Sequence, residues 1–374
     1  MQVYFDNSAT TKVSRRAADK AYEMMTECFG NPSSLHSMGI KAEDELTAAR
    51  KSVAKSLGAD EREIFFTSGA TEANNLALFG TAESRRRTGN KIVTSAIEHS
   101  SVIDSCRRLE NMGCEVVYLK PGNDGKINES DLKAAIDEKT ILVSLMAVNN
   151  ETGAVQPYNS VKRIIKQNNS PALFHCDCVQ AFGKIPIKAE KIGADMLSVT
   201  AHKIHGPKGV GAIYIKKGTR IIPQHYGGEQ EGKIRPGTQA SSLIAAFGCA
   251  VQEIDYSAVE RVKEIRDYIK AFVEKLDRVF INSPDDALPY ILNFSVEGIR
   301  SETMMHFLAS EGIYVSSGSA CAKGKQSHVL EAMGLPKSRV DSALRLSFSK
   351  LSTMEEAQYF CEALKNGMQK IVRK

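Results

Sequence analysis

Short apolar segments alternate with amphipathic segments between about residues 60 and 216 of the chain. Stretches rich in β-branched and aromatic residues predict strands at 63–68, 91–96, 114–120, 141–148, 172–177, 194–200 and 209–217. The intervening segments, such as 70–87, space their apolar residues as a helix does. Strands that alternate with helices are typical of an α/β domain with a mainly parallel sheet.

The pattern changes after about residue 240. Helical spacing runs from Ser241 to about Val279, which predicts one long connecting helix. Strand-like segments at 290–296 and 344–349 follow, and an amphipathic helix from Thr353 closes the chain. These segments are typical of a smaller α+β unit.

The length of 374 residues is too great for one simple core. We therefore predict two domains. The large α/β domain covers 16–250, and the small α+β domain combines 1–15 with 251–374.

Polar groups follow five of the predicted strands. They are Ser68 to Thr71, Glu98 with His99, Asn149 to Glu151, Asp177 with Gln180, and Thr200 with His202 and Lys203. In open α/β sheets, ligands bind outside the carboxyl ends of the strands. The sequence therefore predicts one site built from these groups.

The residue types at these strand ends indicate a particular chemistry. "SGATE" (68–72) at a helix start is either a phosphate site or a plain helix cap. Asp177 ends an apolar strand, so its carboxylate needs a cationic partner or several donors. Lys203 lies between histidines and glycines, and lysines near other cations become nucleophilic amines. Together they describe a pocket for pyridoxal phosphate (PLP), with Lys203 carrying the cofactor and Asp177 facing its ring nitrogen.

One cysteine stands in an unusual setting. Cys321 lies in "SSGSACAKGKQSHVL" (316–330), which reads as an exposed loop of small and polar residues. Most cysteines are buried, so an exposed thiol suggests a chemical task. Lys323 and Lys325 could lower its pKa or attract an acidic acceptor, or they could be solvated lysines without a role.

Composition narrows the function classes. The net charge of +5 comes with no long basic block, so we expect no direct nucleic-acid binding. The longest apolar run, 141–148, is too short to span a membrane, and the N-terminus lacks a signal-peptide pattern.

Eight scattered cysteines suit a reducing cytoplasm. Cys176 and Cys178 could form a metal pair but fit a buried strand better, so we expect no metal site.

Ordered motifs along nearly the whole chain resemble those of a known family. They are "YFDNSATT" (4–11), "GNPSSLH" (30–36), "FFTSGATEANNLA" (65–77), "EHSSV" (98–102), "VNNETG" (148–153), "DCVQAFGK" (177–184), "TAHKIHGPKGVG" (200–211), "GGEQEGKIRPGT" (227–238), "SSGSAC" (316–321) and "LRLS" (344–347). The chain is similar to the cysteine desulfurases of the NifS/IscS-like branch of the class V aminotransferases. The resemblance implies fold type I of the PLP enzymes, with a mainly parallel seven-stranded sheet, and a homodimer with active sites at the subunit interface.

The resemblance also implies roles for individual residues around the cofactor. Lys203 would carry PLP and later move the Cα proton of the substrate. Asp177 would pair with the pyridine nitrogen, and Gln180 would donate to the phenolic oxygen. His99 would stack on the ring and relay protons. Asn150 would lie near the phenolic oxygen and the substrate carboxylate.

Further residues would bind the two anionic groups. Arg345 would clamp the substrate carboxylate, for which its planar fork is suited. The phosphate would be bound by Ala70, Thr71, Thr200, His202 and, from the partner subunit, Thr238.

Cys321 would complete the reaction. Its thiolate would take the sulfur of L-cysteine as a persulfide while L-alanine is released. The sulfur would pass to an acceptor protein for iron–sulfur cluster assembly or for thiolation of tRNA or cofactors. The same thiol could bind an iron–sulfur cluster transiently.

Two departures from the family pattern stand out. The segment after Cys321 is about two residues shorter than is usual, which could limit the acceptors it reaches. Gln239-Ala240 replaces a common Glu-Asn pair near the expected dimer contacts.

Two alternatives stay open at the level of sequence. One is a selenocysteine lyase or aminotransferase of the same fold, and an aminotransferase would need no thiol at Cys321. The other is a catalytically silent partner that binds acceptors or a cluster, against which Lys203, Asp177 and His99 argue.

Overall fold

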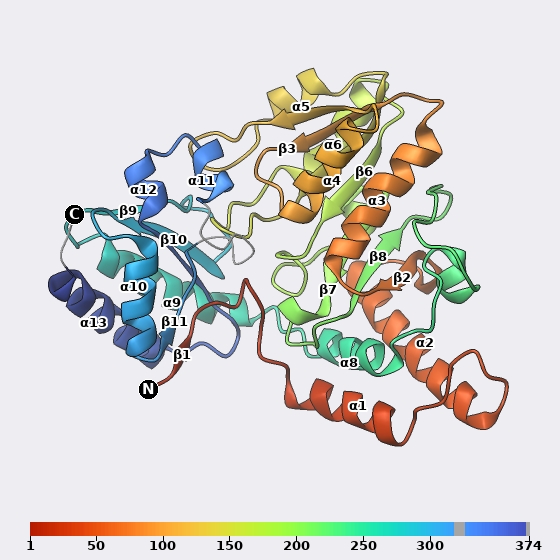
Figure 1. The fold of residues 1–374 in the computed structure, drawn as a ribbon, viewed down its shortest axis with the longest axis horizontal. Coiled ribbons are helices and arrows are strands. Elements are labelled where there is room, and N and C mark those ends of the chain that lie inside the picture. The colour runs from red at the N-terminus through yellow and green to blue at the C-terminus, as the bar shows by residue number, and fades with distance from the viewer. Residues whose placement is uncertain (318–325, 372–374) are drawn as a thin grey trace.

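The computed structural model describes residues 1–317 and 326–371, and its core is a seven-stranded sheet (Figure 1). The strand order is β2-β8-β7-β6-β5-β3-β4. The run from β7 to β4 is parallel, and β8 is antiparallel to both of its neighbours. The strands are β2 (Ile64–Thr67), β3 (Lys91–Ser95), β4 (Glu115–Leu119), β5 (Thr140–Met146), β6 (Leu173–Asp177), β7 (Met196–Thr200) and β8 (Gly211–Ile215). This confirms the predicted fold class.

Helices cover both faces of the large sheet, because successive side chains of its strands point to opposite faces. Ile92 packs with α3 and α4, whereas the adjacent Val93 belongs to the core on the other face. This two-sided burial explains the near-continuous apolar runs in the sequence. The helices of this part are α1 (Arg15–Thr26), α2 (Ser37–Leu57), α3 (Ala70–Arg85), α4 (Ser100–Glu110), α5 (Glu129–Ala135), α6 (Tyr158–Gln167), α7 (Ala189–Ile192) and α8 (Ser241–Gln252), with short turns η1 (Glu61–Glu63), η2 (Ala201–Lys203) and η3 (Gln230–Lys233).

A second, smaller sheet lies beside the first (Figure 1). It is antiparallel, in the order β12-β10-β9, and β1 pairs with β11 nearby. Its elements are β1 (Val3–Tyr4), β9 (Val279–Ile281), β10 (Ile291–Val296), β11 (Ile313–Tyr314), β12 (Ala343–Ser347), α9 (Ala258–Val273), α10 (Ser301–Ser310), α11 (His328–Ala332), α12 (Lys337–Asp341) and α13 (Met354–Lys370). The exact division into 16–250 and the remainder stays a prediction.

The single long helix predicted from Ser241 to Val279 is wrong. The chain forms two helices, α8 and α9, separated at residues 253–257. Asp255 Oδ1 accepts hydrogen bonds from the backbone N–H and the hydroxyl of Ser257, at 2.9 and 2.6 Å. Such a side-chain turn competes with helical hydrogen bonding. The two helices also pack against different partners, α8 against α1 and α2, and α9 against α13.

The N-terminal segment ties the two sheets together. Asn7 donates from its backbone and its side chain to the carbonyl of Ser347 on β12, at 3.2 and 2.9 Å. Thr11 donates to the carbonyl of His202, just beyond β7. Between them, residues 8–10 line the cavity described below. No helix within the described residues is long and apolar enough to cross a bilayer.

Removal of the Phe5 ring tests this attachment. The side chain is fully buried, with ring centroids 5.0 Å from Phe348 and 6.1 Å from Phe360. We expect Phe5→Ala to lower the free energy of unfolding by ~3–5 kcal/mol, the usual cost of an unfilled aromatic site. Urea unfolding measures this loss. The exposed Leu351 provides the control, since Leu351→Ala should stay within ~0.5 kcal/mol of wild type.

Candidate active site

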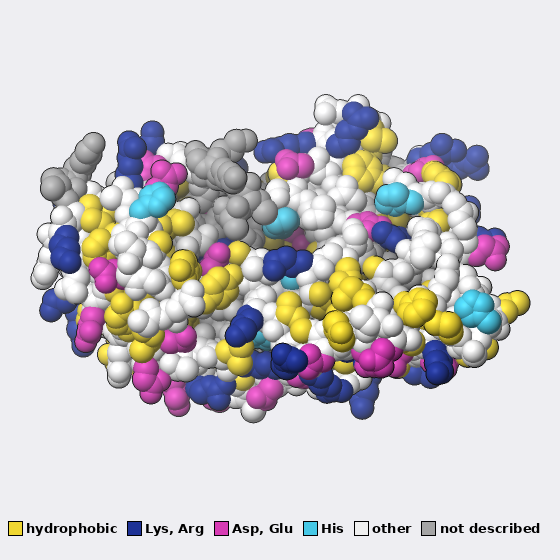
Figure 2. Space-filling view, turned by 60° about the horizontal axis from the view of Figure 1, so that its bottom comes forward, with side chains coloured by type: hydrophobic (Ala, Val, Ile, Leu, Met, Phe, Trp, Pro, Cys, Tyr) yellow, Lys and Arg dark blue, Asp and Glu magenta, His cyan; other side chains and the backbone are white. Residues whose placement is uncertain are grey.

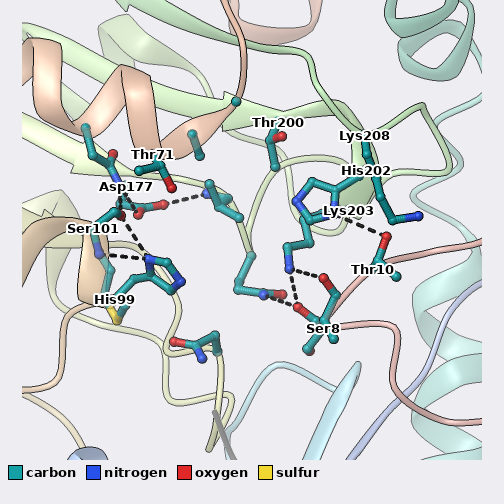
Figure 3. Close-up of a pocket in the computed structure, with 18 of the residues that line it drawn as sticks. Ser8, Thr10, Thr71, His99, Ser101, Asp177, Thr200, His202, Lys203 and Lys208 are labelled. Carbon is teal, nitrogen blue, oxygen red and sulfur yellow. Dashed lines mark hydrogen bonds between the residues drawn. The ribbon is translucent and has the colours of Figure 1, made fainter. Parts of the chain in front are cut away.

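A cavity of about 550 Å³ opens at the carboxyl ends of the parallel strands (Figure 3). Ten residues predicted from the sequence line it: Ala70, Thr71, His99, Asn150, Asp177, Gln180, Thr200, His202, Lys203 and Arg345. Thr238 does not line it and is exposed. Cys321 lies outside the described residues. Most of the candidate residues therefore lie in one place, at the carboxyl ends of the strands, as the sequence predicted.

Asp177 is a buried carboxylate with only neutral donors among the hydrogen bonds described. Its Oδ2 accepts from Asn74 Nδ2 at 2.8 Å, and its Oδ1 accepts from the backbone N–H of Val179 at 3.0 Å. Asn74 also donates to the Ser101 hydroxyl, at 2.9 Å. These contacts orient the carboxylate without neutralising it, so the site favours a cationic ligand group. Sequence reasoning missed Asn74, whose signal is a polar residue on the buried face of α3.

His99 caps α4 and presents one nitrogen to the cavity. Its Nδ1 accepts from the backbone N–H of Ser101 at 3.1 Å. Because a backbone N–H can only donate, Nδ1 is unprotonated and the proton of the neutral ring is on Nε2. Burial lowers the pKa of His99, and the Lys203 charge adds to this while Asp177 opposes it. The ring is therefore a neutral donor at pH 7.

Lys203 lies in η2, directly after β7, and its ammonium is held by the N-terminal segment. Nζ donates to the backbone carbonyls of Ser8 and Ala9, the second at 2.7 Å (Figure 3). Gln180 Nε2 donates to the same Ser8 carbonyl, at 3.1 Å. This role of residues 8 and 9 could not be predicted from the sequence, since it uses only their backbone.

The N-terminus of α3 supplies anion-binding groups. Its first residues, Ala70 and Thr71, leave their backbone N–H groups without helical partners. Lys208 and His202 line the same cavity. Burial, followed by the Lys203 and Lys208 charges, lowers the pKa of His202 to about 4. The neutral imidazole and the cationic Lys208 therefore suit a bound anion.

The position of this helix start is set by a close approach between β8 and the residue that precedes α3. Gly211 on β8 lies so near Gly69 that a Cβ at residue 211 would come within 2.9 Å of the Gly69 backbone. Glu72 accepts from the Ser68 N–H at 2.6 Å and from Arg235 Nε at 2.8 Å. The helix start is thus fixed by packing and by an ion pair.

Arg345 enters the cavity from the small sheet. Its side chain is 1% exposed, and it donates to Asp6 Oδ1 at 2.8 Å and to the Asn150 carbonyl at 3.1 Å. Among the residues that the structure describes, its Nε has no hydrogen-bond partner. A buried guanidinium with donor capacity left over can bind a carboxylate.

The segment that contains Cys321 is attached next to these groups. On one side, Ser316 and Arg345 exchange backbone hydrogen bonds of 3.2 and 2.7 Å. On the other side, Ser327 donates to the buried Glu151, and His328 Nε2 contacts the carbonyl of Glu98 at 3.0 Å. Both attachments thus contact or adjoin residues that line the cavity.

The arrangement suits a ligand that carries both an anionic group and a protonated nitrogen. Backbone donors and cations meet the first, and the unneutralised Asp177 meets the second. Lys203 supplies an amine that can form a covalent bond with a carbonyl group. Cys176 and Cys178 are buried, with their Sγ atoms 3.7 Å apart. Among the described residues no cluster of three or more His, Cys, Asp or Glu side chains could hold a metal ion.

Comparison with known proteins identifies the relatives of this chain. The family model described as "Aminotransferase class-V" matches residues 3–360. A protein of Dictyoglomus turgidum named "Cysteine desulfurase IscS" is 38% identical over 99% of this chain and 95% of its own. A solved structure titled "NIFS-LIKE PROTEIN" superposes with a TM-score of 0.93 at 39% identity, over 99% of this chain and 100% of its own. Another, titled "SspA in complex with cysteine", has a TM-score of 0.84 at 33% identity, over 94% and 100%.

Glu98, next to His99, offers a test of the buried electrostatics. Its Oε1 accepts from the Ser95 hydroxyl and the Met146 N–H, and its Oε2 has no hydrogen-bond partner in the described part of the chain. Burial raises the pKa of Glu98 to about 8, so the folded protein holds a proton there at pH 7. The folded protein therefore binds this proton more tightly than the unfolded chain does. The resulting contribution to the free energy of unfolding is complete below the unfolded pKa of 4.5 and is lost as the pH rises through 8.

Glu98→Gln imitates the protonated carboxyl group and should remove this pH dependence. Relative to wild type, the variant should gain stability as the pH rises from about 5 to 8, by on the order of several kcal/mol. Urea unfolding at a series of pH values measures the difference. A difference that stays constant over this range would show that Glu98 is ionised in the folded protein.

Proposed function

Because the chain belongs to the class V aminotransferase family and is a cysteine desulfurase of the NifS/IscS-like branch, we propose that its cavity binds PLP and L-cysteine and that Cys321 receives the sulfur. The observation that carries the proposal is the meeting of Asp177 and Lys203 in one cavity with the α3 N-terminus. Membership of this family favours the interpretation that these residues belong to an enzyme and not to a catalytically silent partner.

The donor set of the cavity fits PLP. Asp177 would face the pyridine nitrogen, because its described hydrogen bonds come from neutral donors and leave its charge unmatched. Lys203 would carry the cofactor through its amine. The phosphate would be held by Ala70 and Thr71 of α3 together with Thr200 and His202, all of which line the cavity.

Bound PLP withdraws electrons from the substrate Cα. Lys203 would also move the Cα proton, since it lines the same cavity as Asp177 and Arg345. Gln180 would donate to the phenolic oxygen. Neutral His99 would stack against the ring and carry an exchangeable proton on Nε2.

Arg345 and Asn150 would position L-cysteine. The unpartnered Nε of Arg345 is available to the substrate carboxylate while Asp6 and the Asn150 carbonyl hold the other nitrogens. The carboxylate would therefore bind to a guanidinium that is already oriented, which limits the entropy lost on binding. The neighbouring structure bound to cysteine supports this choice of substrate.

Cys321 would accept the sulfur. Its thiolate would attack the substrate sulfur, so that an S–S bond forms while the Cβ–S bond breaks and its electron pair stays with the carbon skeleton that leaves as alanine. The attachment of residues 316 and 327–328 beside Arg345, Glu151 and Glu98 supports this role. Persulfide sulfur would then pass to an acceptor protein in cluster assembly or in thiolation of tRNA or cofactors.

The exposed apolar surface supports a homodimer. Around α1 and the start of α2, large side chains are exposed that a monomer would bury: Tyr22, Met25, Phe29, Leu35 and Ile40. Figure 2, which turns the α1 side forward, shows hydrophobic side chains among the charged ones on that face. Thr238 is exposed and apart from its own cavity, which suits a contact with the partner's cofactor. The cytoplasmic location expected from the sequence remains part of this proposal.

Lys203→Ala tests the cofactor assignment. We expect alanine release from L-cysteine to fall ~10²–10⁴-fold or more, since both the covalent attachment of PLP and a proton carrier are removed. After borohydride reduction, no PLP should be covalently bound to this variant, so denaturation should release all of the cofactor. Lys208→Ala should still bind PLP covalently after the same reduction. Near wild-type turnover by Lys203→Ala would assign the cofactor to another lysine.

Cys321→Ser tests the sulfur acceptor. The variant should still bind PLP and L-cysteine, but its desulfurase rate should fall on the order of 10³-fold, because a hydroxyl cannot accept the sulfur. Mass spectrometry of wild type after incubation with L-cysteine should find one added sulfur on Cys321. Cys28→Ser provides the matched control and should keep full activity. A persulfide on Cys176 or Cys178 would contradict the assignment.

A further inference from the structure

A second buried lysine lies directly behind the cavity. Lys184 follows β6 in the same turn as Gln180 and is 6% exposed. Its Nζ donates to Gln180 Oε1 at 2.8 Å and lies 5.8 Å from the ring centre of Tyr290. Burial of an ammonium group costs free energy, and here its hydrogen-bond partner is a neutral amide oxygen. The placement of Lys184 therefore needs an explanation.

The neighbours of Gln180 decide which way its amide points. The Ser8 carbonyl can only accept, so it takes the amide nitrogen, at 3.1 Å. The Lys184 ammonium can only donate, so it takes the amide oxygen. If the amide were flipped, its oxygen would face the carbonyl oxygen of Ser8, and its N–H groups would face those of Lys184. One N–H of Gln180 then remains for the cavity, which Gln180 lines.

We propose that Lys184 is a positioning residue that fixes the Gln180 amide with its N–H toward the cavity, so that the ring oxygen of bound PLP meets a donor and is kept as an anion. This rests on the proposed function, in which Gln180 faces the phenolic oxygen of PLP. Lys184 acts through Gln180 and does not itself line the cavity.

The charge state of Lys184 is compatible with this role. Burial, followed by the charges of Lys203 and Arg345, lowers the pKa of Lys184 to about 7. Ammonium and neutral amine both carry N–H groups that can donate to Gln180 Oε1. The hydrogen bond from Lys184 to Gln180 can therefore persist on both sides of pH 7. The titratable and charged groups around Lys184 are Tyr290, Lys203, Arg345, His205, Glu253, Asp255 and Lys350.

Lys184→Met in the holoenzyme tests the proposal, because methionine has a similar length without the donor. The readout is the pH midpoint at which the visible absorption of bound PLP changes. Loss of the oriented N–H should make the ring oxygen hold its proton more tightly, so the midpoint should rise by about one pH unit, the tenfold effect of one hydrogen bond. PLP should also dissociate about tenfold faster. Lys191→Met, an exposed lysine on α7, should leave both unchanged.

A double-mutant cycle separates this mechanism from a direct effect of charge. Gln180→Leu should raise the midpoint by a similar amount, and Lys184→Met should add no further shift in that background. Additive shifts would show that Lys184 acts on Lys203 through its charge, and an unchanged midpoint in Lys184→Met would remove its role. Should Lys184→Met fail to fold, an unchanged midpoint in Gln180→Leu would by itself overturn the proposal. A wild-type protein that takes up no PLP would instead contradict the proposed function.

Discussion

The arrangement of the active site depends on seven residues near the N-terminus, Phe5 to Thr11, that lie between the two sheets. Asp6 holds the guanidinium of Arg345 on the small sheet, and the Ser8 and Ala9 carbonyls hold the ammonium of Lys203 beyond the large sheet. One short segment therefore sets the separation of the two cations. Because it contacts each of them with a charge or with carbonyl dipoles, it also offsets part of their mutual repulsion.

Buried groups around the site are held in contrasting charge states. Asp177 has donors to both of its oxygens, whereas Glu98 leaves one oxygen without a partner, and burial raises the pKa of Glu98 to about 8. His175, between the hydroxyls of Ser144 and Ser198, has its pKa lowered by burial to about 4. With Glu98 protonated and His175 neutral, Asp177 is left to match a positive charge in the cavity. Such separation of pKa values by environment is typical of catalytic sites.

The sequence could predict those residues of the site that follow directly after a strand and act through their side chains. Asp177 and Lys203 each follow an apolar strand, and the carboxyl ends of parallel strands meet at one edge of the sheet. The roles of Ser8 and Ala9 could not be predicted in this way, because they contribute backbone carbonyls across nearly 200 residues of sequence. Asn74 was hidden within a helical pattern. The continuous helix from Ser241 was wrong, because the apolar spacing persists across 253–257 while the packing partner changes from α2 to α13.

The described residues on either side of 318–325 are held by the same geometry. On the near side, Ser316 forms a bridge with Arg345, so the strand that would bind the substrate carboxylate also holds this attachment. On the far side Ser327 caps α11 and donates to Glu151, whose neighbour Asn150 accepts from that arginine. Arg345 is therefore linked to both attachments of the segment, directly and through Asn150–Glu151. Both attachments are thereby held beside the residue that would bind the substrate carboxylate.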